Sequence, residues 1–227
     1  MKKLLLISLC YFLAGSLTMA QDSEVKKERT VKGFLHTILY MKDGTTAEGY
    51  LQNSTPGLYV SYRIPDALDS VMILRPDNKL FTKSRKFSSC KIDSMLTWFD
   101  EQPKEKMTWE PQYVDFTFGN SDSELESYPS MLMLLYVGKH VKGYVSFHPI
   151  YGFKYLFMID DMPCAKAFLK VDQKFNEKRR KTLSETFYMY PEMEDYIKRL
   201  TNENIKEDPF CILKKLDVIL SASNSKK

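Results

Sequence analysis

Three histidines are the first residues to consider for chemistry, because imidazole serves both acid–base catalysis and metal binding. They are His36, His140 and His148. His140 and His148 fall on one face of the same predicted strand. Their separation of eight residues corresponds to about 26 Å at the usual rise per residue. They cannot share a metal ion, and we expect each histidine to be a surface or half-buried side chain.

Two neighbouring aspartates, Asp160 and Asp161, follow a predicted strand, where catalytic acids occur but turn-forming aspartates are more common. A glycosidase needs two carboxyl groups at a defined separation in space, which sequence does not show. The sequence contains no glycine-rich phosphate loop, GxSxG, HExxH or EF-hand ligand series. No catalytic residue, cofactor or metal ligand is therefore assigned. A carboxylate-dependent hydrolase acting on a glycan is kept as the alternative hypothesis.

Aromatic residues suggest a candidate binding surface. Trp109, Tyr144 and Tyr151 fall at strand ends, in turns or on the less apolar face of a predicted sheet. Exposed, they would suit a glycan or a peptide; alternatively, the tyrosines line the rim of a β-rich core. Ile150 joins this surface, because residues 148–152 form a turn held between two strongly specified strands. In the alternative interpretation, Ile150 and Tyr151 fold back onto a helix and close the core.

Residues 1–20 have the pattern of a signal peptide. Two lysines precede an apolar stretch at 4–13, and Ala20 supplies the small residue before a cut that leaves Gln21 first. The apolar stretch is too short to span a bilayer. We expect an exported protein, periplasmic or secreted, with no transmembrane segment after cleavage. A membrane anchor and a lipoprotein modified at Cys10 are the alternatives.

Charge argues against nucleic-acid binding. The chain has 33 basic and 29 acidic residues, and the signal segment removes two lysines, which leaves a mature net charge of +2. Nucleic-acid-binding proteins usually show a basic patch and a high pI. The one basic run, at 178–181, is flanked by glutamates and is interpreted as a solvated helix face.

The cysteines do not form a recognisable framework. Cys90, Cys164 and Cys211 remain after cleavage, an odd number with wide spacing. At most one disulfide can form, between a pair that the sequence does not define. Without a Cys-x-x-Cys pair or a Cys/His cluster, no structural zinc site is expected. Each thiol is expected to act as a buried small hydrophobe.

The N-terminal half is predicted to be β structure. Asp43-Gly44 is a strong signal for a two-residue hairpin loop. Strands joined by short turns favour antiparallel pairing, as a meander or a partly open barrel. The predicted strands are residues 32–41, 45–51, 58–62, 70–75, 80–82, 95–99 and 109–118.

The central stretch from 130 to 161 holds most of the apolar residues. Residues 140–147 and 153–159 alternate at period two and predict a hairpin. Residues 130–138 are rich in Met and Leu and end at Gly138, which favours a short helix with a glycine C-cap.

The C-terminal third shows the helical period. Helices are predicted at 177–188, from Pro191, and after an N-cap at Asp208 with Pro209 at the first helical position. Their apolar stripes need a surface to cover, and the β meander offers it. The predicted fold is therefore α+β: an antiparallel, partly barrel-like β meander with C-terminal helices packed on it.

One domain is expected after the signal segment. Residues 21–31 form a flexible lead-in, 32–222 the α+β domain, and 223–227 a polar tail. Residues 100–106 are polar and contain Pro103, which makes them a candidate boundary between two subdomains.

The chain resembles a group of exported proteins of unknown function from Bacteroidetes-type bacteria. The resemblance covers most of residues 32–220 and rests on Asp43-Gly44-Thr45 with Glu48-Gly49-Tyr50, Gly138-Lys139 with Val141, Phe153-Lys154-Tyr155, and Phe187 with Tyr190-Pro191-Glu192 before Ile197. The residues at 65–69 and 101–106 depart from the pattern. The resemblance implies location and fold, and it transfers no active site.

The functional expectation combines these observations. The absence of catalytic motifs and the nearly neutral mature charge favour an exported, non-enzymatic envelope accessory or binding protein. Its partner would be an envelope protein or a glycan.

Overall fold

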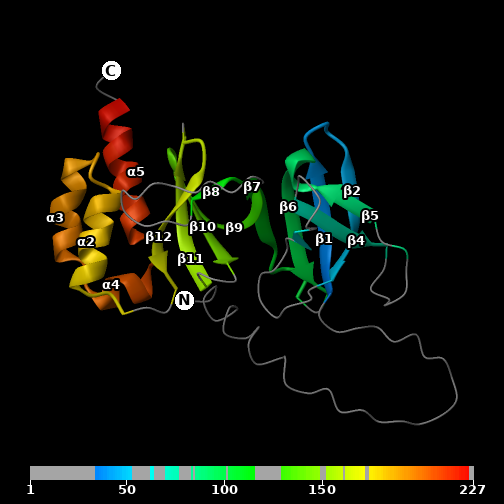
Figure 1. Cartoon of the computed structure of the whole chain (residues 1–227), viewed down its shortest axis with the longest axis horizontal. Helices are drawn as coiled ribbons and strands as arrows, with labels where there is room; N and C mark the ends of the chain where they lie inside the picture. The colour runs from blue at the N-terminus through cyan, green and yellow to red at the C-terminus, as the bar shows by residue number, and fades with distance from the viewer. Residues whose placement is uncertain are drawn as a thin grey trace, which may run out of the picture. The chain divides into compact units, whose positions relative to one another are not determined.

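The computed structural model describes residues 34–52, 62–63, 70–76, 83, 85–100, 102–115, 129–148, 152–160, 162–171 and 174–224. The chain divides into two compact units between Thr108 and Trp109. The sheet structure is mostly antiparallel and open, and four C-terminal helices pack against it (Figure 1), so the predicted α+β class is confirmed. The predicted signal segment and lead-in lie outside the described residues.

The first unit is a meander of short strands. They are β1 (Phe34–Met41), β2 (Thr46–Gln52), β3 (Tyr62–Arg63), β4 (Ser70–Arg75), β5 (Arg85–Ser88) and β6 (Ile92–Phe99), with a 3-10 turn η1 (Ser89–Lys91). β2 and β6 flank β1, β4 pairs with β2, and β3 and β5 pair with β4, all antiparallel. Along β1, Leu35, Thr37 and Leu39 are buried, as strand alternation requires.

Most of the predicted strands in this unit are confirmed. β1, β2, β4 and β6 match the predictions at 32–41, 45–51, 70–75 and 95–99. β5 was missed, because its exposed Arg85 and Lys86 leave little apolar alternation to recognise. The predicted strand at 80–82 lies outside the described residues, as does 58–61.

The β1–β2 loop is longer than the predicted two-residue turn. The backbone N–H of Met41 donates to the carbonyl of Thr45 at 2.9 Å, so Lys42 joins Asp43 and Gly44 in the loop. Gly44 has a φ of 81°, a conformation that glycine adopts without a steric penalty. The Asp43 carboxylate accepts from the Thr45 hydroxyl and backbone N–H, and these bonds lower the pKa of Asp43.

The second unit contains a six-strand path followed by the helices. Its strands are β7 (Met107–Gln112), which begins two residues before the boundary, β8 (Val114–Asp115), β9 (Ser130–Val137), β10 (Val141–His148), β11 (Gly152–Ile159) and β12 (Ala165–Lys170). They follow the order β7-β9-β10-β11-β12-β8. Within this path β8 and β12 are parallel, and the other pairs with a described register are antiparallel. The predicted β10–β11 hairpin is confirmed, while residues 149–151 of its turn lie outside the described residues.

The predicted helix at 130–138 is wrong, because this segment is the strand β9. Met131, Leu132 and Met133 are all buried, so successive side chains on opposite faces of the strand are covered. A strand covered on both faces loses its alternation and resembles a short apolar helix in sequence. Burial between β7 and β10 outweighs the helical preference of Met and Leu.

The helices are α2 (Glu177–Thr186), α3 (Pro191–Arg199), α4 (Asn202–Glu207) and α5 (Cys211–Asn224). α2 and α3 agree with the predictions, including the proline in the first turn of α3. α5 begins after Phe210 rather than at Pro209, and the Asp208 carboxylate accepts from the backbone N–H of Phe210 at 3.1 Å. α4 was missed, because none of its side chains is buried and it has no apolar stripe.

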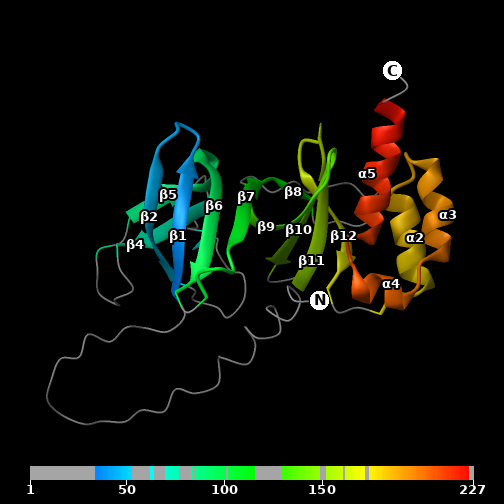
Figure 2. The same cartoon turned by 180° about the vertical axis from the view of Figure 1, so that it is seen from behind.

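The helices gather on one side of strands β10–β12 (Figures 1 and 2). The aromatic rings of Tyr155 and Phe168 each approach the Phe210 ring, with centroids 5.2 and 6.4 Å from it. Gly143 on β10 makes room for this packing, since a Cβ there would lie 2.6 Å from the Phe210 ring. The opposite face of the sheet is also closed, by a second apolar cluster: Val114, Leu132, Tyr144, Leu156, Ala165 and Ala167.

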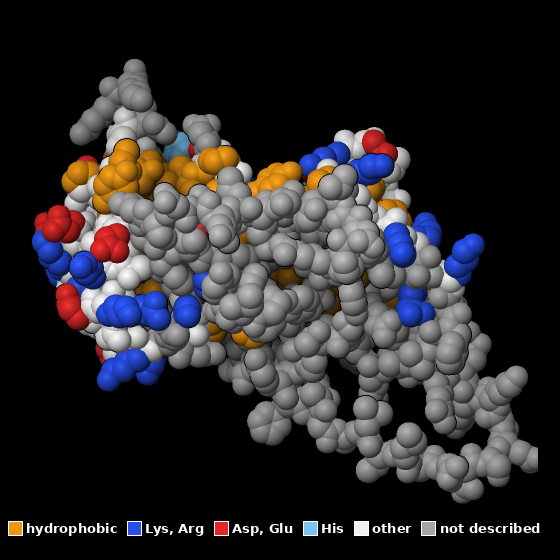
Figure 3. Space-filling model, in the orientation of Figure 1, with side chains coloured by type: hydrophobic (Ala, Val, Ile, Leu, Met, Phe, Trp, Pro, Cys, Tyr) orange, Lys and Arg blue, Asp and Glu red, His pale blue; other side chains and the backbone are white. Residues whose placement is uncertain are grey.

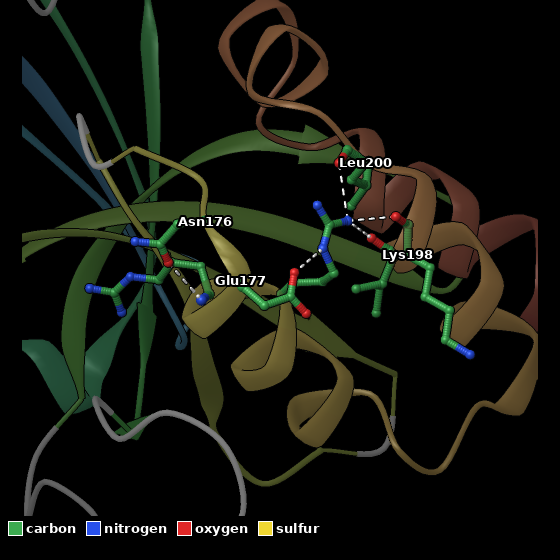
Figure 4. A network of polar contacts seen from close by, with 7 residues as sticks. Asn176, Glu177, Lys198 and Leu200 are labelled. Carbon is green, nitrogen blue, oxygen red and sulfur yellow. Dashed lines mark hydrogen bonds and ion pairs between the residues drawn. The ribbon is translucent and has the colours of Figure 1, made fainter.

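The basic run at 178–181 is only partly a solvated face. Arg180 reaches from α2 to the end of α3, where its Nη1 donates to the carbonyls of Ile197, Lys198 and Leu200 at 2.7, 2.7 and 3.1 Å (Figure 4). Its Nε donates to Glu177 at 3.1 Å. A helix end leaves carbonyls without internal partners, and Arg180 satisfies them here.

Candidate functional site

Several large apolar side chains of the second unit are strongly exposed. Val137, Tyr188, Met189 and Val218, together called the apolar rim, are 64%, 61%, 66% and 62% exposed. Val137 ends β9, Tyr188 and Met189 connect α2 to α3, and Val218 lies in the second half of α5. Figure 3 shows hydrophobic side chains gathered along the end of this unit where α2 joins α3 and α5 finishes. Single exposed apolar residues are ordinary, but a gathered set marks an interaction surface.

Asp217 anchors the β9–β10 turn beneath the rim. Its carboxylate accepts from the backbone N–H of Lys139 at 3.0 Å and from that of His140 at 2.6 Å. Gly138 permits this approach, because a Cβ there would lie 2.6 Å from the carboxyl carbon of Asp217. The helix and the turn are therefore held together by two charge-assisted hydrogen bonds, which are stronger than neutral ones. Val137 directly precedes Gly138 and Val218 directly follows Asp217. The hydrogen bonds of Asp217 therefore hold the backbone to which both valines are attached.

His140 and Asp160 form the polar pair at the same turn. His140 Nδ1 lies 2.8 Å from Asp160 Oδ2, and their side chains are 14% and 59% exposed. The backbone N–H of Asp160 also donates to the His140 carbonyl at 3.2 Å. His140 Nε2 is buried and has no hydrogen-bond partner within the described structure. A carboxylate that orients an imidazole through Nδ1 leaves Nε2 to exchange a proton or bind a polar group.

Of the two carboxylates named in the alternative hypothesis, the structure describes only Asp160. Asp160 pairs with an imidazole, and Asp161 lies outside the described residues. A glycosidase acid needs a raised pKa. The described carboxyl groups with a shifted pKa are all shifted down: Asp43 by its bonds from Thr45, Glu194 by Lys198, and Glu203 by its own backbone N–H. Within the described part of the chain, no three His, Cys, Asp or Glu side chains are grouped to hold a metal ion.

Two members of the predicted aromatic surface are buried. Trp109 is 2% exposed and Tyr144 is 0% exposed, so the interpretation of these two as exposed is wrong. Tyr144 donates to Glu110 at 2.6 Å, and Lys142 Nζ lies 2.9 Å from the same carboxylate. Burial, together with the Glu110 bond, raises the pKa of Tyr144. Strand alternation predicted on which face of the sheet the Tyr144 side chain lies, but it did not predict that this face is buried. Ile150 and Tyr151 lie outside the described residues.

A ladder of aromatic rings in the first unit was not predicted. His36 on β1 stacks on Trp98 of β6 with centroids 4.3 Å apart, and Tyr50 of β2 lies 4.9 Å from the imidazole. Lys106 covers the Trp98 ring at 4.9 Å. Because the rings face one another, the ladder does not offer the open ring face on which a sugar stacks. The ladder depends on the strand register, which places His36 opposite both Tyr50 and Trp98, and a single strand pattern does not show that register.

No disulfide joins the three cysteines that the structure describes. Cys164 is buried, and Cys90 and Cys211 are half-buried. Burial raises the pKa of Cys164 and of Cys211, which keeps both in the unreactive thiol form.

Comparison with known proteins gives no family. No family model matches the chain, and no curated protein or solved structure is significantly similar to it. No helix among the described residues has the length and apolar character needed to cross a membrane.

Proposed function

We propose that this chain is an exported, non-enzymatic envelope accessory protein that binds a protein partner through the apolar rim. The observation that carries the proposal is the exposure of four large apolar side chains of a single unit, between 61% and 66%. Exposed apolar surface costs free energy in water, and a partner that covers it recovers this cost.

The chemistry of the rim favours a protein over a glycan. Two valines, a methionine and a tyrosine offer aliphatic and thioether surface that packs against apolar side chains. A sugar needs open aromatic faces and a dense set of hydrogen-bonding groups. The aromatic ladder at His36 and Trp98 has its ring faces occupied. Val137 and Val218 of the rim also adjoin the anchored β9–β10 turn, so binding does not first have to order these two residues.

Export is part of the same proposal and rests on the signal-peptide pattern of residues 1–20. N-terminal sequencing of the protein from an envelope or secreted fraction should begin at Gln21. An intact Met1, or a lipid on Cys10, would contradict export by cleavage after Ala20.

A capture experiment with matched variants tests the partner. The mature chain is used as bait in envelope extract that retains glycans, with Met189→Ser/Val218→Ser as the rim variant and Tyr40→Ser as control. Tyr40 is 39% exposed and lies in the first unit. We expect the rim variant to lose partner recovery about tenfold, a 1.4 kcal/mol effect, with an unchanged melting temperature, and the control to recover it fully. Equal recovery by all three proteins would reject the rim as the binding surface.

A second candidate, a hydrolase acting on a glycan, is favoured by the His140–Asp160 pair. The Asp160 carboxylate contacts Nδ1 of His140 at 2.8 Å, the arrangement in which a carboxylate orients an imidazole for acid–base chemistry, and Nε2 is buried. Incubation of the mature protein with envelope glycans should then release new reducing ends, and Asp160→Asn should abolish that release. If the native protein releases none, the accessory function stands alone.

A further inference from the structure

The connection between α2 and α3 presents two apolar side chains on a firmly held backbone. Tyr188 and Met189 are 61% and 66% exposed, whereas Phe187 and Met193 on either side of them are buried, at 1% and 0%. The backbone N–H of Tyr190 donates to the Phe187 carbonyl at 2.9 Å, and that of Met193 donates to the Tyr190 carbonyl at 2.9 Å. Buried anchors and hydrogen bonds thus hold the backbone of the exposed pair, so binding needs little further ordering there.

The two helices carry acids beside this connection and bases at the far end of the pair. Glu185 precedes the connection, Glu192 follows it, and both are exposed. At the far end, Arg180 from the first half of α2 donates to the Ile197 carbonyl near the end of α3 at 2.7 Å (Figure 4). The helices therefore run in opposite directions, and the basic run at 178–181 lies away from the connection.

The two glutamates are available to a partner. Among the described residues, the ion pairs within α2 and within α3 do not include Glu185 or Glu192. The acids are also a local feature, since the mature chain has a net charge of +2. Charges beside an apolar contact steer the approach of a partner and select the sign of the charges that it carries.

We infer that the α2–α3 connection binds a protein segment in which apolar side chains are flanked by lysine or arginine. The apolar side chains of the segment cover Tyr188 and Met189, and its cations pair with Glu185 and Glu192. Tyrosine is frequent among residues that dominate binding energy, and methionine adapts its shape to the partner. The same two carboxylates repel nucleic acid and anionic lipid. The inference rests on the proposed function and narrows its partner to a basic one.

Peptides of one pattern and different charge test the inference directly. A fluorescently labelled amphipathic peptide of leucine and lysine is titrated with the mature protein, and matched peptides carry glutamine or glutamate in place of lysine. We expect the lysine peptide to bind about tenfold more tightly than the glutamine peptide, with a preference that shrinks as salt is raised. Equal affinity for the lysine and glutamine peptides would overturn the inference.

Matched variants locate the binding on the protein. Met189→Ser should weaken the binding of both the lysine and the glutamine peptide, whereas Glu185→Gln/Glu192→Gln should remove only the advantage of lysine. Glu105→Gln/Glu207→Gln makes the same change of charge at two other exposed acids and should leave that advantage in place. All the substituted side chains are exposed, so the melting temperatures should agree. An equal loss of the lysine preference in the two double glutamine variants would mean that net charge alone attracts the peptide.

Capture from envelope extract separates this inference from the proposed function. Glu185→Gln/Glu192→Gln should lose partner recovery, as Met189→Ser/Val218→Ser does. If the rim variant loses the partner while the glutamine variant keeps it, the rim stands and the basic partner is rejected. Selective binding of the lysine peptide without rim-dependent capture would support the inference and count against an envelope partner.

Discussion

The carboxylate of Asp217 in α5 accepts a hydrogen bond of 2.6 Å from the backbone N–H of His140, which precedes it by 77 residues. The same carboxylate accepts from Lys139. One side chain thus satisfies two backbone donors of the β9–β10 turn and fixes where the last helix lies on the sheet.

Replacing Asp217 by alanine should therefore destabilise the second unit by about 1–3 kcal/mol, the usual contribution of hydrogen bonds to a charged group, because two backbone donors lose their carboxylate acceptor. Chemical denaturation followed by circular dichroism measures the change. Asp195→Ala on the exposed face of α3 is the matched control and should cost little. Equal stability of the two variants would show that solvent replaces the Asp217 bonds without loss.

Gly143 is expected to tolerate no larger side chain. A Cβ at this position would lie 2.6 Å from the Phe210 ring and 2.9 Å from Leu213. Gly143→Ala should cost about 1–3 kcal/mol through overpacking. Adding Phe210→Leu should return part of that loss, because the smaller side chain leaves room for the new methyl group. Additive losses in the double variant would contradict a direct contact.

Arg180→Met should destabilise the α2–α3 pair. The substitution leaves the carbonyls of Ile197 and Leu200 without their guanidinium donor, at a cost of about 1–3 kcal/mol. It also removes the ring contact between Arg180 and Phe175 at 5.1 Å. Lys181→Met, next to it in sequence but exposed, provides the comparison in a thermal melt. A melting temperature that responds equally to both changes would mean that water serves the α3 terminus as well as Arg180 does.

Lys154 should make stability depend on alkaline pH. Its pKa falls from an ordinary value of 10.5 to about 8 in the folded chain, so the unfolded chain binds more protons between these two values. The free energy of unfolding should therefore rise as pH increases from 8 to 10.5, by up to about 3 kcal/mol from this group. Below pH 8, Lys154 is charged in both the folded and the unfolded chain, so the free-energy cost of burying its charge is fully present. Lys154→Met should remove this part of the slope, and identical pH profiles for the two proteins would contradict it.

Sequence predicted the elements whose apolar residues keep a regular period. β1, β10 and β11 alternate, and α3 carries its apolar stripe at helical spacing, so each could be recognised alone. β9 could not, because β7, β10 and buried side chains on both faces remove the alternation. β12 was also missed: Ala165, Ala167 and Phe168 are buried, but Lys166 and Lys170 interrupt them.

The candidate binding surface could not be predicted from local sequence patterns, for a related reason. Tyr144 and Val218 differ in what covers them, not in the periodicity of their own elements. The Asp217 bonds join residues far apart in the chain, and Asp115 lies opposite Lys166 only when β8 pairs with β12. Such features depend on long-range pairing, which a single sequence does not reveal.

The parallel pairing of β8 with β12 also bears on the order of assembly. The backbone N–H of Ala165 donates to the Tyr113 carbonyl at 2.8 Å, across a long stretch of intervening chain. The β10–β11 hairpin closes a short loop, and local contacts form faster than distant ones because less chain entropy is lost. Asp115 therefore arrives beside Lys166 after the hairpin has formed. β8 is therefore the part of this sheet expected to open first, and a transient opening would expose Asp115 while the rest of the sheet stays closed.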